Sequence, residues 1–177
     1  DRPFGRTLPR RIQRHWLSQR LAIIAAVEHY TAVLGDWIVT DSAGLDRAGA
    51  DPVMVDLLRW HGAEEVEHRS VAFDLFQHLS GSYFRRVETM VVSAIALFFL
   101  FVSGTRFFLA HDPSSPAKAT WGQFRRATRR GLLPTMRLVF GTVPDYLRRD
   151  HHPSQHGSTQ AALDYLATSP AARAAAS

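Results

Sequence analysis

Three carboxylates and two imidazoles fall within the eight residues from His61 to His68. Glu65 and His68 are three residues apart, so on a helix their side chains lie on one face, one turn from each other. A Glu-x-x-His pair placed in this way can bind a metal ion from one side. Four-helix carboxylate proteins build di-iron or di-manganese centres with this unit. The stretch therefore predicts a metal site, and the alternative is a solvated acidic face.

Glu28 is a further candidate ligand, because it lies in an apolar run where an acid is not expected on a packing face. A buried carboxylate is costly unless it is paired or binds a metal. The chain contains no cysteine, so any metal must be held by His, Asp and Glu. These ligands suit iron or manganese, with zinc as a further option. We predict Glu28, Glu65 and His68 as metal ligands.

Other acids and histidines compete for these roles. Glu64 is four residues before His68 and can share its face, whereas Glu67 lies about 100° round the helix and is expected in solvent. His61 is four residues before Glu65, and a ligand, a hydrogen-bonding support of a ligand and a packed core histidine all remain open. We expect His61 and Glu64 to support the ligands.

Seven more histidines lie outside this stretch, and four of them are candidates for a role near a metal. His29 follows Glu28 and points elsewhere on its helix, so we expect it at the surface or in support of a ligand. A metal-binding role for it stays open. His151, His152 and His156 form a His-rich segment that could bind metal. For this segment we favour a solvated loop.

Hydrophobic spacing predicts helices along the chain and gives no convincing strand pattern, so the predicted fold is all-α. Asp51 followed by Pro52 is a typical helix start. Residues 1–14 are expected to be a linker or arm, residues 15–110 the metal-site helices, and residues 111–177 a basic helical C-terminal extension. The predicted helices cover residues 12–40, 52–79, 83–110, 121–140 with an interruption at Pro134, and 159–166.

Residues 89–105 form an uncharged run of seventeen residues. A membrane-spanning helix needs about 20 such residues, and a run of about 10–14 usually marks a buried helix. We favour a fully buried core helix, and the alternative is a membrane-inserted or interfacial helix. The Arg-rich block at residues 125–130 is either a solvated face or a contact with anionic lipid or an acidic partner.

Composition excludes several classes of function. The net charge is +5 over 177 residues, but residues 21–117 hold twelve acids against six Arg. An acidic centre between basic flanks does not form the continuous basic face of a nucleic-acid-binding domain. A phosphate-binding glycine loop and the Gly-x-Ser-x-Gly elbow of serine hydrolases are both missing. No signal peptide is recognisable, so we expect a cytoplasmic protein, associated with the inner face of the membrane if the apolar run meets lipid.

Residues 27–32, 60–74 and 146–153 together resemble the bacterial family named "predicted metal-dependent hydrolase". The resemblance implies a ferritin-like helical fold with a dinuclear metal centre. It makes Glu28 the lone carboxylate of one helix, and Glu65 with His68 the Glu-x-x-His of the next. The implied function is metal-dependent hydrolysis. The alternatives are a di-iron oxygenase acting on a small apolar substrate and a non-catalytic, membrane-associated helical protein.

The family pattern places another Glu and another Glu-x-x-His on two helices before the matching part. Residues 1–27 contain no Glu and only one histidine, His15. A four-helix site needs ligands from all four helices. We therefore expect that half of the centre is missing from this chain, which holds only part of a ferritin-like bundle. The first residue is not Met, which favours a fragment; the alternatives are that a partner supplies the missing ligands and that the site is incomplete. A homo-oligomer is a separate expectation about partners.

Overall fold

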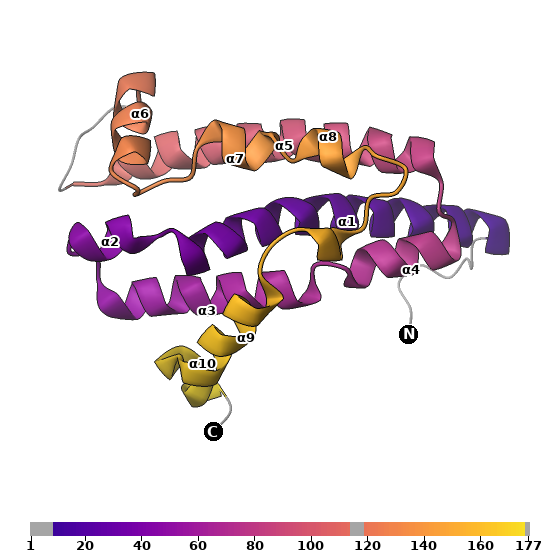
Figure 1. Cartoon of the computed structure of the whole chain (residues 1–177). Helices are drawn as coiled ribbons and strands as arrows, with labels where there is room; N and C mark the ends of the chain where they lie inside the picture. The colour runs from indigo at the N-terminus through magenta and orange to yellow at the C-terminus, as the bar shows by residue number, and fades with distance from the viewer. Residues whose placement is uncertain (1–8, 114–118, 176–177) are drawn as a thin grey trace, which may run out of the picture.

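The computed structural model describes residues 9–113 and 119–175, and in these ranges the chain is helical without any strand. The predicted all-α class is therefore confirmed, whereas the ferritin-like arrangement stays a prediction. Figure 1 shows α5, α7 and α8 above α1, with α3 and α4 below it. The elements are α1 (Arg10–Thr40), α2 (Ala43–Arg47), α3 (Pro52–His68), α4 (Val71–Leu79), α5 (Tyr83–His111), α6 (Trp121–Arg129), α7 (Met136–Phe140), α8 (Val143–Tyr146), η1 (Pro153–Gln155), α9 (Thr159–Thr168) and α10 (Pro170–Ala175).

Helix α1 is the central element, and α3, α4 and α5 all pack against it. Its buried stripe consists largely of small residues, among them Ala22, Ala25 and Ala26. Small side chains allow neighbouring helices to approach closely. The closest approach is between Gly35 of α1 and Gly62 of α3, where a Cβ on Gly35 would overlap the Gly62 carbonyl. The small residues of α1 thus fix the distance to α3.

The predicted single helix over residues 52–79 is wrong, because the chain breaks between α3 and α4. The α3 start is as expected, since Asp51 Oδ1 accepts hydrogen bonds from the Val53 and Met54 amides at 2.9 and 3.0 Å. The break lies at Arg69, which is buried and donates from Nε to the Pro153 carbonyl at 3.0 Å. Its Nη2 donates to Thr159 Oγ1 at 2.9 Å. These acceptors come from the C-terminal segment, so the helix ends where a buried guanidinium reaches them.

The C-terminal segment contributes to the core. Tyr146 of α8 is fully buried and packs in one cluster with Tyr30, Phe73 and Met90. Helix α9 packs on α3, with Ala162 buried against Ala63 and Val66. The C-terminal segment therefore contacts α1, α4 and α5 through Tyr146 and contacts α3 through α9.

Helix α5 is mostly open to solvent along its apolar part. Both α1 and α5 are long and apolar enough to cross a membrane by length and composition. The most apolar 18-residue window of α1 is 39% buried in the fold, whereas that of α5 is 17% buried. The favoured expectation that the run over residues 89–105 is a fully buried core helix is therefore wrong. Phe99, Leu100 and Phe108 are between 64% and 74% exposed.

Candidate metal centre

The structure brings Glu28 of α1 and Glu65 of α3 to the same side of the helix pair. Thr31, one turn after Glu28, donates a hydrogen bond from Oγ1 to Glu65 Oε2 at 2.5 Å. Glu28 Oε2 in turn accepts a hydrogen bond from the Ala72 amide at the start of α4, at 3.3 Å. Each carboxylate is therefore anchored to a neighbouring helix through one oxygen.

The neighbouring groups Glu65 and His68 affect the pKa of Glu28. Partial burial raises the pKa of Glu28 above its usual value of 4.5, and the nearby negative charge of Glu65 raises it further. The Ala72 hydrogen bond and the neighbouring His68 lower the pKa of Glu28, but they do not cancel the rise. In the described part of the chain, no Arg or Lys forms an ion pair with Glu28 or Glu65. A bound cation would supply the missing positive charge.

The remaining histidines and acids of the stretch differ in exposure. His68 is the last residue of α3 and is exposed. The His61 Nε2 lies 3.4 Å from Glu65 Oε1, and the His61 side chain is 63% exposed whereas that of Glu65 is 16% exposed. His61 thus reaches the carboxylate from the solvent side and is not a packed core histidine. Glu64 is half-buried, and Glu67 is exposed.

Glu28, Glu65 and His68 are of the right chemical types to bind a metal ion, but too few of them converge on one point. Two carboxylates and an imidazole are the ligand types expected for iron, manganese or zinc. Nevertheless, no three His, Asp or Glu side chains within residues 9–113 and 119–175 are arranged to hold a metal ion. Glu28, Glu65 and His68 influence one another without forming a complete coordination shell. They remain the predicted ligands of this side of a centre.

Residues 2–157 match the family described as "predicted metal-dependent hydrolase". The chain belongs to this family. The match covers most of the 177 residues and includes all three predicted ligands. A metal cofactor is part of the family description, whereas the metal's identity and the number of ions are not. No curated protein and no solved structure gives a significant match to the chain.

This metal-dependent hydrolase family member also contains a buried histidine cluster that the sequence did not reveal. His29 and His151 are 3% and 5% exposed, so the expected surface position of His29 and the expected solvated loop at His151 are wrong. The ring centroids of His29, His151 and His156 lie between 5.6 and 6.2 Å apart. One feature of the sequence does indicate the burial of His29: it continues the stripe of Ala22, Ala25 and Ala26 at helical spacing.

Burial keeps the rings of His29 and His151 neutral, because it lowers the pKa of both. Desolvation lowers the pKa of His29 to about 3, and the neighbouring His151 and His156 add to this effect. Desolvation likewise lowers the pKa of His151 to about 4. Both ring nitrogens of His151 are buried and lack a hydrogen-bond partner among the described residues. A buried polar atom without a partner costs about 1–3 kcal/mol. His151 therefore lowers the stability of the folded protein.

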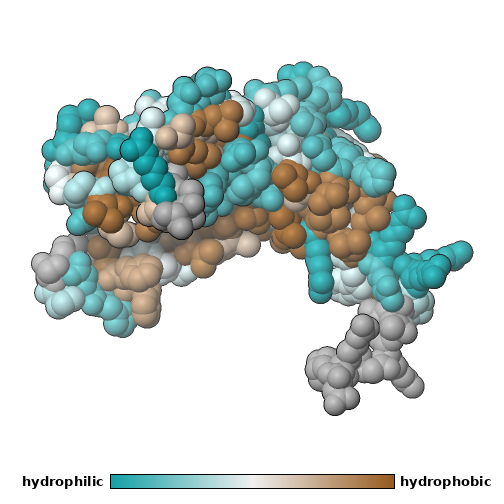
Figure 2. All heavy atoms as spheres, turned by 90° about the horizontal axis from the view of Figure 1, so that it is seen from below, coloured by the Kyte–Doolittle hydropathy of each residue, from teal (hydrophilic) through white to brown (hydrophobic). Residues whose placement is uncertain are grey.

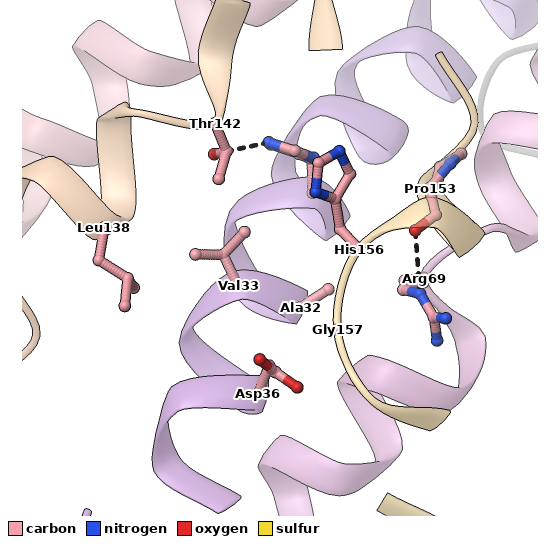
Figure 3. Close-up of a pocket in the computed structure, with 10 residues that line it drawn as sticks. Ala32, Val33, Asp36, Arg69, Leu138, Thr142, Pro153, His156 and Gly157 are labelled. Atoms are coloured by element: carbon pink, nitrogen blue, oxygen red, sulfur yellow. Dashed lines mark hydrogen bonds between the residues drawn. The ribbon is translucent and has the colours of Figure 1, made fainter. Parts of the chain in front are cut away.

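A small cavity of about 170 Å³ adjoins this cluster. Figure 3 shows Asp36 and Val33 of α1 on one side of it, with His156 and Thr142 nearby. His29 Nε2 lies 2.9 Å from Thr142 Oγ1. None of the three predicted metal ligands lines the cavity. The cavity is therefore a separate feature from the carboxylate group.

Proposed function

We propose that this chain forms one side of the metal centre of a hydrolase, with Glu28, Glu65 and His68 as its ligands. The observation that supports this most is the pair of carboxylates from α1 and α3 on one side, without a Lys or Arg partner in the described chain. A bound metal ion acts as a Lewis acid and lowers the pKa of a bound water, which makes it a nucleophile near neutral pH.

The neighbouring groups orient the carboxylates. The Thr31 hydroxyl donates to Glu65 Oε2, so the other oxygen, Oε1, is directed towards His61. The Ala72 amide fixes Glu28 Oε2. Hydrogen bonds of this kind hold ligands in the orientation that a metal requires. Thr31 and His61 are therefore proposed as positioning residues.

The proposed centre is dinuclear, with iron or manganese as the favoured metals. One Glu on one helix and one Glu-x-x-His on the next is half of the donor set that four-helix carboxylate proteins use. The other half would come from protein groups outside this 177-residue chain. The same donor set serves a di-iron oxygenase, and the hydrolase is preferred because the family description names it.

Metal content tests the proposal. The substitutions Glu65→Ala and His68→Ala are expected to reduce bound iron or manganese at least about tenfold, since losing even a residue that supports a ligand has that effect. Glu67→Ala is the matched control, because Glu67 is exposed on the same helix. Elemental analysis of the purified proteins gives the answer, and circular dichroism confirms that each variant is folded. Unchanged metal content in both ligand variants would refute the assignment.

We propose, as a second function, that α5 and α6 bind the surface of an anionic membrane on the cytoplasmic side. The apolar part of α5 is largely uncovered, and Trp121 at the start of α6 is 65% exposed. Arg47, Arg129 and Arg130 line a hollow of about 330 Å³. None of these three guanidinium groups pairs with a carboxylate in the described chain. An apolar helix beside unpaired Arg suits an anionic lipid surface.

Co-sedimentation with lipid vesicles tests this second function. Wild-type protein is expected to bind phosphatidylglycerol-containing vesicles and to bind pure phosphatidylcholine vesicles weakly. The double substitution Arg129→Ala/Arg130→Ala should weaken binding to the anionic vesicles roughly tenfold or more, since each Arg contributes about 1 kcal/mol near such a surface. Arg10→Ala/Arg11→Ala makes the same charge change at the far end of α1 and serves as the control. Equal binding to both vesicle types would contradict an electrostatic contact.

A further inference from the structure

The Glu28 carboxylate is bound by a backbone amide at the break between α3 and α4. Its Oε2 accepts a hydrogen bond from the Ala72 amide at 3.3 Å. In an unbroken helix over residues 52–79, this amide would donate to the carbonyl four residues earlier, that of His68. Helix α4 instead begins at Val71, and the first four amides of a helix have no acceptor within it. The break therefore makes the Ala72 amide available to Glu28.

Arg69 stabilises this break from the α3 side. Its side chain is buried, and its Nη1 donates a hydrogen bond to the Val66 carbonyl. In an unbroken helix this carbonyl would accept from the amide of Ser70. Arg69 thus occupies an acceptor that the next turn of the helix would use, and α3 ends at His68.

The other acceptors of Arg69 lie in the 152–159 segment, far along the chain. Its Nε donates to the Pro153 carbonyl at 3.0 Å, and its Nη2 donates to Thr159 Oγ1 at 2.9 Å. A guanidinium group presents its donors in one rigid plane. These acceptors therefore fix the 152–159 segment relative to the end of α3.

Two further contacts place the 152–159 segment against α4 and α1. His152 Nε2 lies 3.0 Å from Asp74 Oδ1 of α4. The Ser158 amide donates to Asp36 Oδ1 of α1 at 2.8 Å. Figure 2, which looks at the molecule from the side of α3 and α4, shows hydrophobic patches in several places on this surface. Apolar contact is not directional, so the hydrogen bonds decide where the segment lies.

We propose that Arg69 is a positioning residue of the metal centre: it ends α3 against the 152–159 segment, and the break directs the Ala72 amide to Glu28. This inference rests on the proposed function, in which Glu28 is a metal ligand. Hydrogen bonds from neighbouring groups orient the ligands of a metal, and their loss typically weakens metal binding about 10–100-fold. Arg69 acts one step further away, through the backbone. The 152–159 segment thereby contributes to metal binding, although it contains none of the three predicted ligands.

Metal content and stability together test the role of Arg69. Arg69→Met removes the donors at similar side-chain length and is expected to lower bound iron or manganese at least about tenfold. Arg59→Met is the matched control, because Arg59 lies on the same helix and donates to Ser42 and Asp46 instead. Both variants should unfold at lower urea concentration than wild type, but Arg59→Met should keep its metal. Elemental analysis and urea unfolding measure the two effects.

Nuclear magnetic resonance tests the link to Glu28 without any metal. In the full chain in EDTA, Glu28→Gln is expected to shift the ¹H–¹⁵N signal of the Ala72 amide, because a neutral group replaces the carboxylate. In the Arg69→Met background the same substitution should leave this signal unchanged. If Arg69→Met does not fold, Thr159→Val decides, since it removes one acceptor of Arg69 and keeps the side-chain size. It should reduce both the metal content and the response of the Ala72 signal.

The outcomes separate this proposal from the proposed function. If the two ligand variants lose metal and the variants of Arg69 and Thr159 do not, the positioning role is overturned and the metal assignment stands. Equal loss of metal in Arg69→Met and Arg59→Met would also overturn it, because lost stability would then be the cause. So would an Ala72 signal that responds fully to Glu28→Gln in both backgrounds. If no variant loses metal but the Ala72 signal behaves as expected, the proposed function is overturned and the control of Glu28 by Arg69 stands.

Discussion

Replacing Gly35 with alanine is expected to lower the free energy of unfolding by roughly 3 kcal/mol or more. A Cβ at this position would overlap the Gly62 carbonyl oxygen and lie 3.1 Å from Gly62 Cα. Both obstacles are backbone atoms, so no side-chain rotation relieves the overlap. The two helices must move apart along the contact that carries the Thr31–Glu65 hydrogen bond. The same substitution should therefore also reduce metal binding.

Gly104→Ala is the control for this prediction. Gly104 lies inside α5, and a Cβ there would meet no atom within 4 Å. Alanine is a better helix former than glycine by about 1 kcal/mol. The control variant should therefore be slightly more stable than wild type. Urea unfolding followed by circular dichroism measures both variants, and a Gly35→Ala protein as stable as wild type would show that α1 and α3 do not touch there.

The helices could be predicted from the sequence because their periodicity is local. The expected start at Asp51 agrees with the observed cap, and the expected helix over residues 83–110 agrees with α5 to within one residue. The break at Arg69 could not be predicted in this way. Its cause is a set of hydrogen bonds to Pro153 and Thr159, which are more than eighty residues away in the sequence. No local pattern encodes such acceptors.

The candidate site could likewise be predicted only where its residues follow a local pattern. Spacing alone placed Glu65 and His68 on one side of a helix, and the acid within an apolar run pointed to Glu28. The burial of His151 was missed, because it depends on contacts with Phe73 of α4 and Tyr146 of α8. The exposure of α5 was also missed, since hydrophobicity shows that a helix avoids water but not which surface covers it.

The carboxylates and the open side of α5 suit different surroundings. Glu28 and Glu65 are held between α1, α3 and α4, and a purely lipid environment would leave these charges without solvation. The open side of α5 carries exposed apolar side chains such as Phe99 and Phe108, and the chain continues from it into the basic α6. An anionic lipid surface therefore suits α5 and α6 and does not suit the carboxylate pair.

Lowering the pH from 7 to 5 is expected to destabilise the protein, and His151 should account for roughly 1–2 kcal/mol of the loss. The pKa of His151 is about 4 in the folded protein and 6.5 in the unfolded chain. Between these values the unfolded chain binds a proton that the folded protein excludes. The stabilisation is therefore complete above pH 6.5 and decreases as the pH falls towards 4.

The substitution His151→Phe isolates this contribution. Phenylalanine fills a similar volume among Phe73 and Tyr146 but cannot bind a proton, so the variant should lose less stability between pH 7 and pH 5 than wild type. It should also be at least as stable as wild type at pH 7, because it removes two buried nitrogens that have no partner in the described chain. His78→Phe, at an exposed position of α4, should follow the wild-type curve. Urea unfolding at both pH values measures the differences. If His151→Phe lost as much stability as wild type, the ring would be protonated in the fold or hydrated by water that reaches its nitrogens.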